Sequence, residues 1–143
     1  MAETPGLVLD TNVFVSGLIS ESGAPARILH AFRRRRAIHL VSDPIVEEYL
    51  RVLNYPRIRK FKKISDEFIL NIATYLIYQT RRIELVSTVT LSPDPDDDKF
   101  LQTAIDGTAS LLVSGDKADL LALGEIAKIP IVTPSEAIAR LGL

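Results

Sequence analysis

The chain has no cysteine and no tryptophan, and its two histidines are His30 and His39. These absences exclude disulfide frameworks and zinc bound by cysteine. The two histidines fall on different predicted elements, so a histidine-based metal site or a Ser-His-Asp triad has almost nothing to draw on, and we expect each to be an ordinary surface or packing residue. No apolar run approaches the ~18 residues of a membrane span, and no signal-peptide pattern opens the sequence. We expect a cytoplasmic, soluble protein without a membrane partner.

The length and apolar content predict a single domain over residues 1–143. With 143 residues, of which 47% are hydrophobic, the chain can bury a core without disulfides or structural metals. Short apolar runs at residues 7–9, 38–41, 83–86, 110–113 and 129–132 predict five strands. Patterns typical of helices lie between and after them, at residues 13–20, 25–36, 44–54, 66–80, 96–107, 120–127 and from 134 onward. Ser42-Asp43-Pro44 predicts a capped helix start, Thr133-Pro134-Ser135-Glu136 predicts a capping box, and residues 87–95 predict a loop. This alternation predicts a three-layer α/β/α domain with a five-stranded parallel sheet.

Positive charge is concentrated in one part of the sequence, although the net charge is only -1. Residues 27–63 hold 11 of the 17 lysines and arginines and three acids. Such a segment would attract an anionic polymer such as RNA. The candidate contacts are Arg33, Arg34, Arg35, Arg36, Arg57, Arg59 and Lys60. A solvated helix end and a charged loop explain the same residues without any ligand.

Acidic residues follow four successive predicted strands. They are Asp10 after the first strand, Asp43, Glu47 and Glu48 after the second, Asp94 and Asp96 to Asp98 after the third, and Asp116 and Asp119 after the fourth. Several have simpler explanations as turn formers or helix caps. Asp10 and Asp116, however, directly follow apolar strands of one sheet, where unpaired carboxylates would repel each other. A divalent cation would relieve that repulsion, and Mg²⁺ or Mn²⁺ suits an all-oxygen site.

Four blocks of sequence carry a resemblance to a known family. They are Leu7-Val8-Leu9-Asp10-Thr11-Asn12, Ser42 to Leu53, Asp94-Pro95-Asp96-Asp97-Asp98-Lys99-Phe100-Leu101, and Val113-Ser114-Gly115-Asp116-Lys117-Ala118-Asp119. In this order and at these separations they resemble PIN-domain proteins, and most of all the VapC-like ribonuclease toxins of toxin-antitoxin modules. The resemblance implies the sheet order 3-2-1-4-5, a Mg²⁺ or Mn²⁺ cofactor and endonucleolytic hydrolysis of single-stranded RNA. It also implies a cognate antitoxin and a homo-oligomer.

Carried over position by position, the resemblance assigns the metal-binding acids to Asp10, one of two paired glutamates, Asp98 and Asp116, with Asp119 as an auxiliary acid. It assigns supporting polar roles to Asn12 and Ser114. The helical wheel does not separate Glu47 from Glu48, and the following aromatic-x-x-Val-Leu run favours Glu48 as the family's acid. Asp98 is preferred because Asp96 and Asp97 are expected to cap the helix.

The sequence thus predicts a metal-dependent endoribonuclease. Asp10, Asp98 and Asp116 would hold one or two cations, and Glu48 would complete the site or position the attacking water. A phosphatase of the haloacid-dehalogenase type also begins with a strand ending in Asp, but it needs a second Asp where this chain has Asn12. A module of the same fold that binds RNA or a partner without cleaving it is the remaining alternative.

Overall fold

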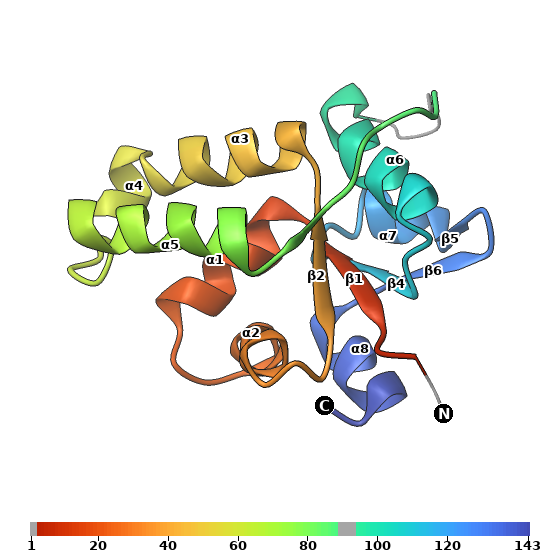
Figure 1. Ribbon diagram of the computed structural model, residues 1–143, viewed down its shortest axis with the longest axis horizontal. Helices are drawn as coiled ribbons and strands as arrows, with labels where there is room; N and C mark the ends of the chain where they lie inside the picture. The colour runs from red at the N-terminus through yellow and green to blue at the C-terminus, as the bar shows by residue number, and fades with distance from the viewer. Residues whose placement is uncertain (1–2, 89–93) are drawn as a thin grey trace.

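The computed structural model describes residues 3–88 and 94–143, and it shows alternating strands and helices (Figure 1). The strands are β1 (Gly6–Leu9), β2 (Ile38–Val41), β3 (Arg81–Arg82), β4 (Leu111–Val113), β5 (Glu125–Ile126) and β6 (Ile129–Val132). The helices are α1 (Thr11–Ile19), α2 (Ala24–Arg33), α3 (Asp43–Leu53), α4 (Pro56–Arg59), α5 (Asp66–Tyr78), the 3-10 helix η1 (Pro95–Asp97), α6 (Asp98–Asp106), α7 (Leu120–Leu123) and α8 (Pro134–Leu141). The predicted α/β class is confirmed.

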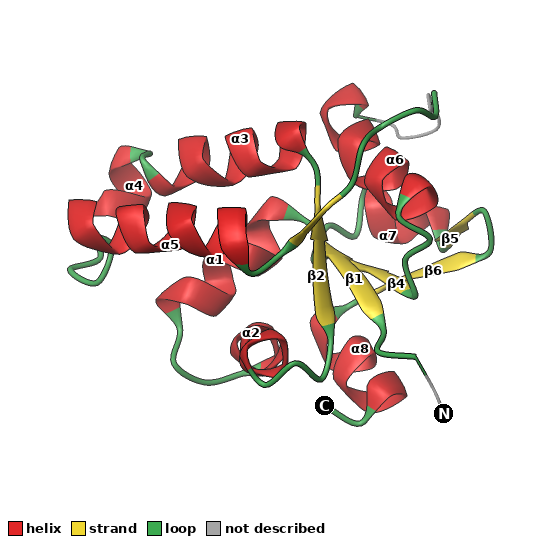
Figure 2. Ribbon diagram, in the orientation of Figure 1, coloured by secondary structure: helices red, strands yellow, loops and turns green. Residues whose placement is uncertain are grey.

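The strands form one sheet in the order β3-β2-β1-β4-β6-β5 (Figure 2). Every neighbouring pair is parallel except β5 with β6. β1 lies at the centre, where Leu7 is paired with His39 of β2 and with Leu111 of β4. The predicted order 3-2-1-4-5 is confirmed, with β6 as the fifth strand of that order. All carboxyl ends of the parallel strands therefore lie at one edge of the sheet, which we call the carboxyl edge.

The helices cover the sheet in two groups, because the chain changes direction at β1. From β1 it moves outward through β2 to β3, and from β4 it moves the other way to β6. Right-handed crossovers then place α1, α2, α3 and α5 on one face and α6 and α7 on the other. α8 contacts α2 and β4. No helix in the described part of the chain is both long and apolar enough to cross a bilayer.

Capping side chains begin several of the helices. The Ser65 hydroxyl accepts from the Phe68 amide at 3.1 Å at the start of α5. Thr133 and Glu136 form the predicted capping box of α8, with Pro134 at the first helical position. The predicted cap at Ser42 or Asp43 is wrong: the Ser42 hydroxyl contacts the Thr103 hydroxyl at 2.7 Å, and Asp43 pairs with Arg82. Ser42 therefore joins the end of β2 to α6 instead of capping α3.

The third strand lies earlier and is shorter than the prediction of residues 83–86. β3 is only Arg81–Arg82, paired with Leu40 and Val41, and the Ile83 amide makes one more bond to the Val41 carbonyl at 2.7 Å. β2 ends at Val41 and α3 begins two residues later, so β2 offers no further partner. The alternating apolar residues after Ile83 therefore continue as irregular chain. The predicted loop at 87–95 falls partly on residues 89–93, which lie outside the described residues.

A sixth strand replaces the end of a predicted helix. The helix expected over 120–127 stops at Leu123, Gly124 has φ 75°, and β5 then pairs with β6 in an antiparallel hairpin. The two residues of its turn, Ala127 and Lys128, have φ of 49° and 68°. Such turns normally carry Asn or Gly, so this sequence shows no hairpin signal.

Candidate metal site at the carboxyl edge

Asp10 is held rigidly at the end of β1. It is 5% exposed, and its amide bonds the Val113 carbonyl of β4 at 3.0 Å. One carboxylate oxygen accepts from the Val13 amide at 2.9 Å and so caps α1. The other accepts from the Ser114 hydroxyl and from the Gly115 amide at 3.3 Å. Burial raises the pKa of Asp10, its hydrogen bonds oppose that rise, and the Asp116 charge adds to it.

Asp116 is placed beside Asp10 by the turn that follows β4. Its amide donates to the Ser114 hydroxyl at 3.0 Å, the same hydroxyl that donates to Asp10. Its carboxylate accepts from the amides of Ala118 and Asp119 at 3.1 and 3.2 Å, which fixes the turn. Partial desolvation and then the Asp116 charge raise the pKa of Asp119. Ser114 is thus the residue that links the two predicted acids, and its supporting role in the site stays a prediction.

Asp97 brings a third segment of chain to the same place. Desolvation raises its pKa to about 7, and the charges of Asp94, Asp116, Asp119 and Asp10 add to the rise. One carboxylate oxygen from each of Asp94, Asp97 and Asp119 lies within 4.8 Å of the others. The acids that follow β1 and β4 and those that precede α6 therefore converge at the carboxyl edge. We call Asp10, Asp94, Asp97, Asp116 and Asp119 the acidic cluster.

The donors of the acidic cluster fit a hard divalent cation. All are carboxylate oxygens, the ligand type that Mg²⁺ and Mn²⁺ prefer. Neighbouring carboxylate charges contribute to raised pKa values at Asp10, Asp97 and Asp119, so the charges repel one another without a counter-ion. A bound cation would relieve this repulsion.

The prediction that Asp97 caps α6 is wrong. Asp97 occupies the N-cap position, yet its side chain makes no capping bond. The capping contact in this loop comes from Asp94, whose carboxylate accepts from the Asp96 amide at 3.0 Å. Asp98 is the first residue of α6 and is half-buried. Its role as a metal ligand stays a prediction, and the charges that act on Asp97 make that residue the stronger candidate.

Glu48 lies on α3 next to the acidic cluster and is held by opposite charge. One carboxylate oxygen accepts from Lys99 at 2.6 Å and lies 3.6 Å from Arg51. The other accepts from the hydroxyl of Thr11, the neighbour of Asp10 in sequence. Lys99 is the second residue of α6, so this ion pair ties α3 to α6 across the carboxyl edge. Glu47, the alternative acid, is exposed.

The predicted RNA-binding residues lie in two separate places. Arg33 to Arg36 end α2 and lead into the first residue of β2, so they lie at the opposite edge of the sheet from the acidic cluster. Arg57, Arg59 and Lys60 belong to α4 and its end, beyond the far end of α3 (Figure 1). Asn12 is exposed in the first turn of α1.

The sequence interpretation did not assign to the site four residues that the structure places at or beside the acidic cluster: Thr11, Asp94, Asp97 and Lys99. Asp97 was hidden within a run of three aspartates, where periodicity cannot tell which side chain turns inward. Lys99 could have been suspected as a basic residue inside an acidic block. Nothing in the sequence marks Thr11, whose partner lies 37 residues away.

The sheet order and the acidic carboxyl edge together define an α/β domain suited to binding a divalent cation. Comparison with known proteins gives the family: a model of the PIN domain matches residues 6–118. The uncharacterized protein MJ1680 of Methanocaldococcus jannaschii is 32% identical over 117 residues, which cover 82% of this chain and 74% of the relative. The chain belongs to the PIN-domain family, whose fold is a nuclease fold.

Proposed function

We propose that this protein is a Mg²⁺- or Mn²⁺-dependent endoribonuclease that hydrolyses phosphodiester bonds of single-stranded RNA. The observation that carries the proposal is the convergence of Asp10, Asp97 and Asp116 from three separate segments onto the carboxyl edge of a PIN domain. Gathering carboxylates in this way costs free energy, because each added charge raises the cost of ionising the others, and a bound cation would offset that cost.

Asp10, Asp97 and Asp116 would hold the cation, with Asp94 and Asp119 at its rim. Asp98 remains the alternative ligand that the family resemblance implies. When bound, such a cation lowers the pKa of a coordinated water and neutralises charge that develops on the phosphodiester. The protein's own part is to keep the acids in place: three hydrogen bonds fix the Asp10 carboxylate, and two backbone amides fix that of Asp116.

Glu48 and Lys99 act beside the cation. The Glu48 carboxylate, held by Lys99 and Thr11, is positioned to orient the attacking water. Lys99 holds the Glu48 carboxylate in an ion pair, and its positive charge favours the approach of a phosphate group. Binding and orientation of RNA thus fall to side chains around the acidic cluster.

Cleavage of a labelled single-stranded RNA of mixed sequence tests the proposal. We expect cleavage with Mg²⁺ or Mn²⁺, none with EDTA, and recovery when Mn²⁺ is added back in excess. Asp10→Asn should bind the same RNA and fail to cut it. RNA binding without cleavage by the wild-type protein would instead support a non-catalytic module. A wild-type protein that neither binds nor cleaves the RNA would contradict both the endoribonuclease and the non-catalytic module.

We further propose that the protein is the toxin of a type II toxin-antitoxin module and forms homo-oligomers. The toxin role rests on the resemblance of its motif blocks to VapC-like toxins. Exposed apolar side chains on α5, namely Leu70, Ile77 and Tyr78, support association with another chain. Induced expression should arrest growth of the host for the wild type and not for Asp10→Asn. Light scattering that shows a monomer at all concentrations would contradict the oligomer.

A further inference from the structure

His39 lies at the meeting point of four helices and has no assigned role. It is 1% exposed on β2, and its ring contacts one aromatic ring from each of α1, α2, α3 and α5. Phe32 stacks on it at 4.6 Å, and the rings of Phe14, Tyr49 and Tyr75 lie 5.4 to 5.9 Å away. A polar ring at such a position needs partners for both of its nitrogens.

Two tyrosine hydroxyls supply these partners and fix the tautomer. The Tyr49 hydroxyl donates its hydrogen to the Leu9 carbonyl at 2.6 Å. Its oxygen must therefore accept from His39 Nε2, 3.2 Å away, which makes Nε2 the protonated nitrogen. Nδ1 is then left to accept from the Tyr75 hydroxyl at 2.9 Å. The result is a directed chain of hydrogen bonds from Tyr75 through His39 and Tyr49 to Leu9, which we call the His39 chain.

Burial keeps His39 neutral, which this arrangement requires. Complete burial lowers its pKa to about 3, so the ring carries no second proton at neutral pH. An imidazolium would donate from both nitrogens and could not accept from Tyr75.

The inner end of the His39 chain is formed by the sequence neighbours of two site acids. Leu9 precedes Asp10, and Tyr49 follows Glu48. The β1-β2 ladder pairs Gly6 with Ile38 and Leu7 with His39, whereas β1 stays paired with β4 as far as Leu9. The Tyr49 hydroxyl therefore holds the last carbonyl of β1 on the side of β2.

We infer that His39 is a positioning residue of the carboxyl edge: through the Tyr49 hydroxyl it fixes the Leu9 carbonyl and so sets the place of Asp10 relative to Glu48. Its catalytic consequence rests on the proposed nuclease function, while its structural consequence does not. His39 touches neither carboxylate in the structure and acts only through Tyr49.

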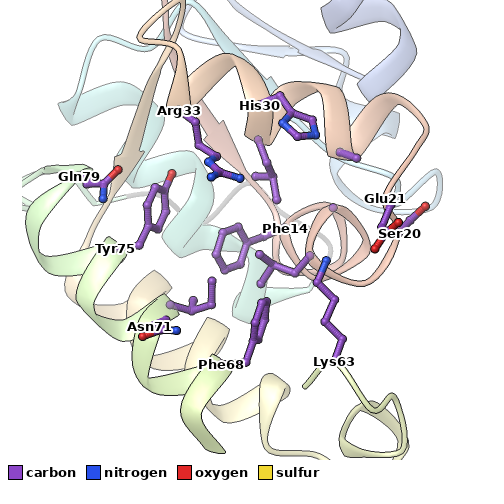
Figure 3. Close-up of a pocket in the computed structure, with 15 residues that line it drawn as sticks. Phe14, Ser20, Glu21, His30, Arg33, Lys63, Phe68, Asn71, Tyr75 and Gln79 are labelled. Atoms are coloured by element: carbon purple, nitrogen blue, oxygen red, sulfur yellow. The ribbon is translucent and has the colours of Figure 1, made fainter. Parts of the chain in front are cut away.

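The outer end of the His39 chain differs from the inner end in its access to water. Tyr75 lines a cavity of about 620 Å³ between α1, α2 and α5, together with Phe14, Arg33 and Asn71 (Figure 3). Water in this cavity can replace a deleted Tyr75 hydroxyl. Tyr49 is completely buried, so nothing replaces its hydroxyl. Deletions should therefore matter more at the inner end than at the outer end.

Amide spectra test the structural consequence without any metal or RNA. The amides of Val13 and Gly115 donate to the Asp10 carboxylate, so their ¹H-¹⁵N shifts report its position. Tyr49→Phe and His39→Phe each keep an aromatic ring at the position and remove the hydrogen bonds that the side chain makes. Both variants should move these two peaks clearly. Tyr75→Phe should move them less. Tyr78→Phe on the same helix, 79% exposed, is the matched control and should leave them unchanged.

His39→Gln provides the rescue, because its amide can still donate to Tyr49 while His39→Phe cannot. We expect the Gln variant to return both peaks toward their wild-type positions. If Tyr49→Phe does not fold, the comparison of His39→Gln with His39→Phe decides. Val13 and Gly115 peaks that stay in place in folded Tyr49→Phe or His39→Phe would overturn the inference.

Kinetics of RNA cleavage test the catalytic consequence. Displacing Asp10 misaligns the reacting groups rather than weakening RNA binding, so His39→Phe and Tyr49→Phe should lower kcat roughly tenfold to a hundredfold with KM unchanged. A rise in KM by the same factor, with kcat unchanged, would contradict the positioning role. Absence of metal-dependent cleavage by the wild-type protein would contradict the proposed function instead, and the amide shifts would still decide the position of Asp10.

Discussion

The carboxylates of the acidic cluster differ in burial and in the number of hydrogen bonds that hold them. Asp10 is buried and accepts three hydrogen bonds, whereas Asp94 is exposed. Asp97 is intermediate in burial, and this partial burial together with four neighbouring charges raises its pKa to about 7. A cation entering this place would therefore meet a fixed ligand at Asp10 and displace a proton at Asp97.

Replacing two neighbouring aspartates one at a time tests which of them binds the metal ion. Asp97→Asn should reduce Mn²⁺ affinity and cleavage strongly, because it removes a carboxylate that faces Asp10, Asp116 and Asp119. Asp98→Asn is the matched control at the adjacent position and should have the smaller effect on both. Equilibrium Mn²⁺ binding and initial cleavage rates measure the difference. The reverse ranking would restore Asp98 as the ligand that the family resemblance implies.

The buried His39 should make stability depend on pH. Its pKa is about 3 in the folded chain against an ordinary 6.5, so between these values only the unfolded chain binds the proton. The contribution of His39 to stability should therefore rise with pH up to about 6.5 and then level off, by at most ~1.4 kcal/mol per pH unit. Asp97, whose pKa is raised to about 7, contributes with the opposite sign over the same range. Urea unfolding of the wild type and of His39→Gln from pH 5 to 8 isolates the histidine, because the stability of the wild type relative to the variant should rise with pH up to about 6.5. His30→Gln at an exposed position is the control; a difference between the wild type and His39→Gln that does not change with pH would refute the assignment.

The candidate site could be predicted in outline from the residues that end buried strands. Asp10 and Asp116 were found because each directly follows an apolar run, and the structure places them around the shared Ser114 hydroxyl. The choice among Asp96, Asp97 and Asp98 could not be made, since it depends on how a 3-10 turn rotates ahead of α6. The importance of His39 was also missed, because its partners come from three distant segments.

At the scale of elements, α1 and α2 approach each other closely at Gly17. A Cβ at this position would lie 2.7 Å from Leu29 Cδ1 and 2.9 Å from the Pro25 carbonyl oxygen. Backbone cannot move aside as a flexible side chain can, so the two helices depend on the missing side chain for their packing.

Gly17→Ala should destabilise the protein although alanine is the better helix former. The propensity gain is about 1 kcal/mol, and overpacking where the helices are this close costs about 1 to 3 kcal/mol. We expect a net loss of up to about 2 kcal/mol by denaturant unfolding. Ser16→Ala on the exposed side of the same helix is the control and should stay within about 0.5 kcal/mol. A stabilised Gly17→Ala variant would show that the two helices can separate freely.

Elements with strong local signals were predicted, and those set by tertiary pairing were not. The apolar run of β1 and the capping box of α8 determine those elements locally. The length of β3 depends instead on where β2 ends, and β5 exists because Gly124 and the Ala127-Lys128 turn let the chain pair with β6. A charged segment likewise forms α4, whose helical turn begins at Pro56.

At the scale of the whole molecule, the two basic groups lie on different sides of the acidic cluster. α3 runs from the carboxyl edge toward α4 (Figure 1). Glu48 and Arg51 of α3 are followed in the sequence by Arg57 of α4 and by Lys60 at its end. Arg36 instead binds the Gly142 carbonyl near the end of the chain, at 3.0 Å. We therefore expect RNA to extend from the acidic cluster along α3.

The salt dependence of RNA affinity tests this route. Replacing Arg57 and Lys60 by Gln should lower the slope of log affinity against log salt by roughly one for each phosphate group that is no longer neutralised. Arg34→Gln combined with Arg35→Asn removes the same charge at the opposite edge and should leave the slope unchanged; Asn suits Arg35, whose φ is 58°. If only the second pair changes the slope, RNA binds across the other edge.

Mn²⁺ binding to the wild type and to Asp10→Asn tests the central claim, that the carboxyl edge is built around a divalent cation. Without metal, Asp10→Asn should be as stable as the wild type or slightly more stable, because the raised pKa of Asp10 shows that burial disfavours its charge. With Mn²⁺ at a hundred times the dissociation constant, the wild type should gain about 2.7 kcal/mol of unfolding free energy, and Asp10→Asn should show little of that gain. An equal Mn²⁺ stabilisation of both proteins, or none in the wild type, would contradict the account.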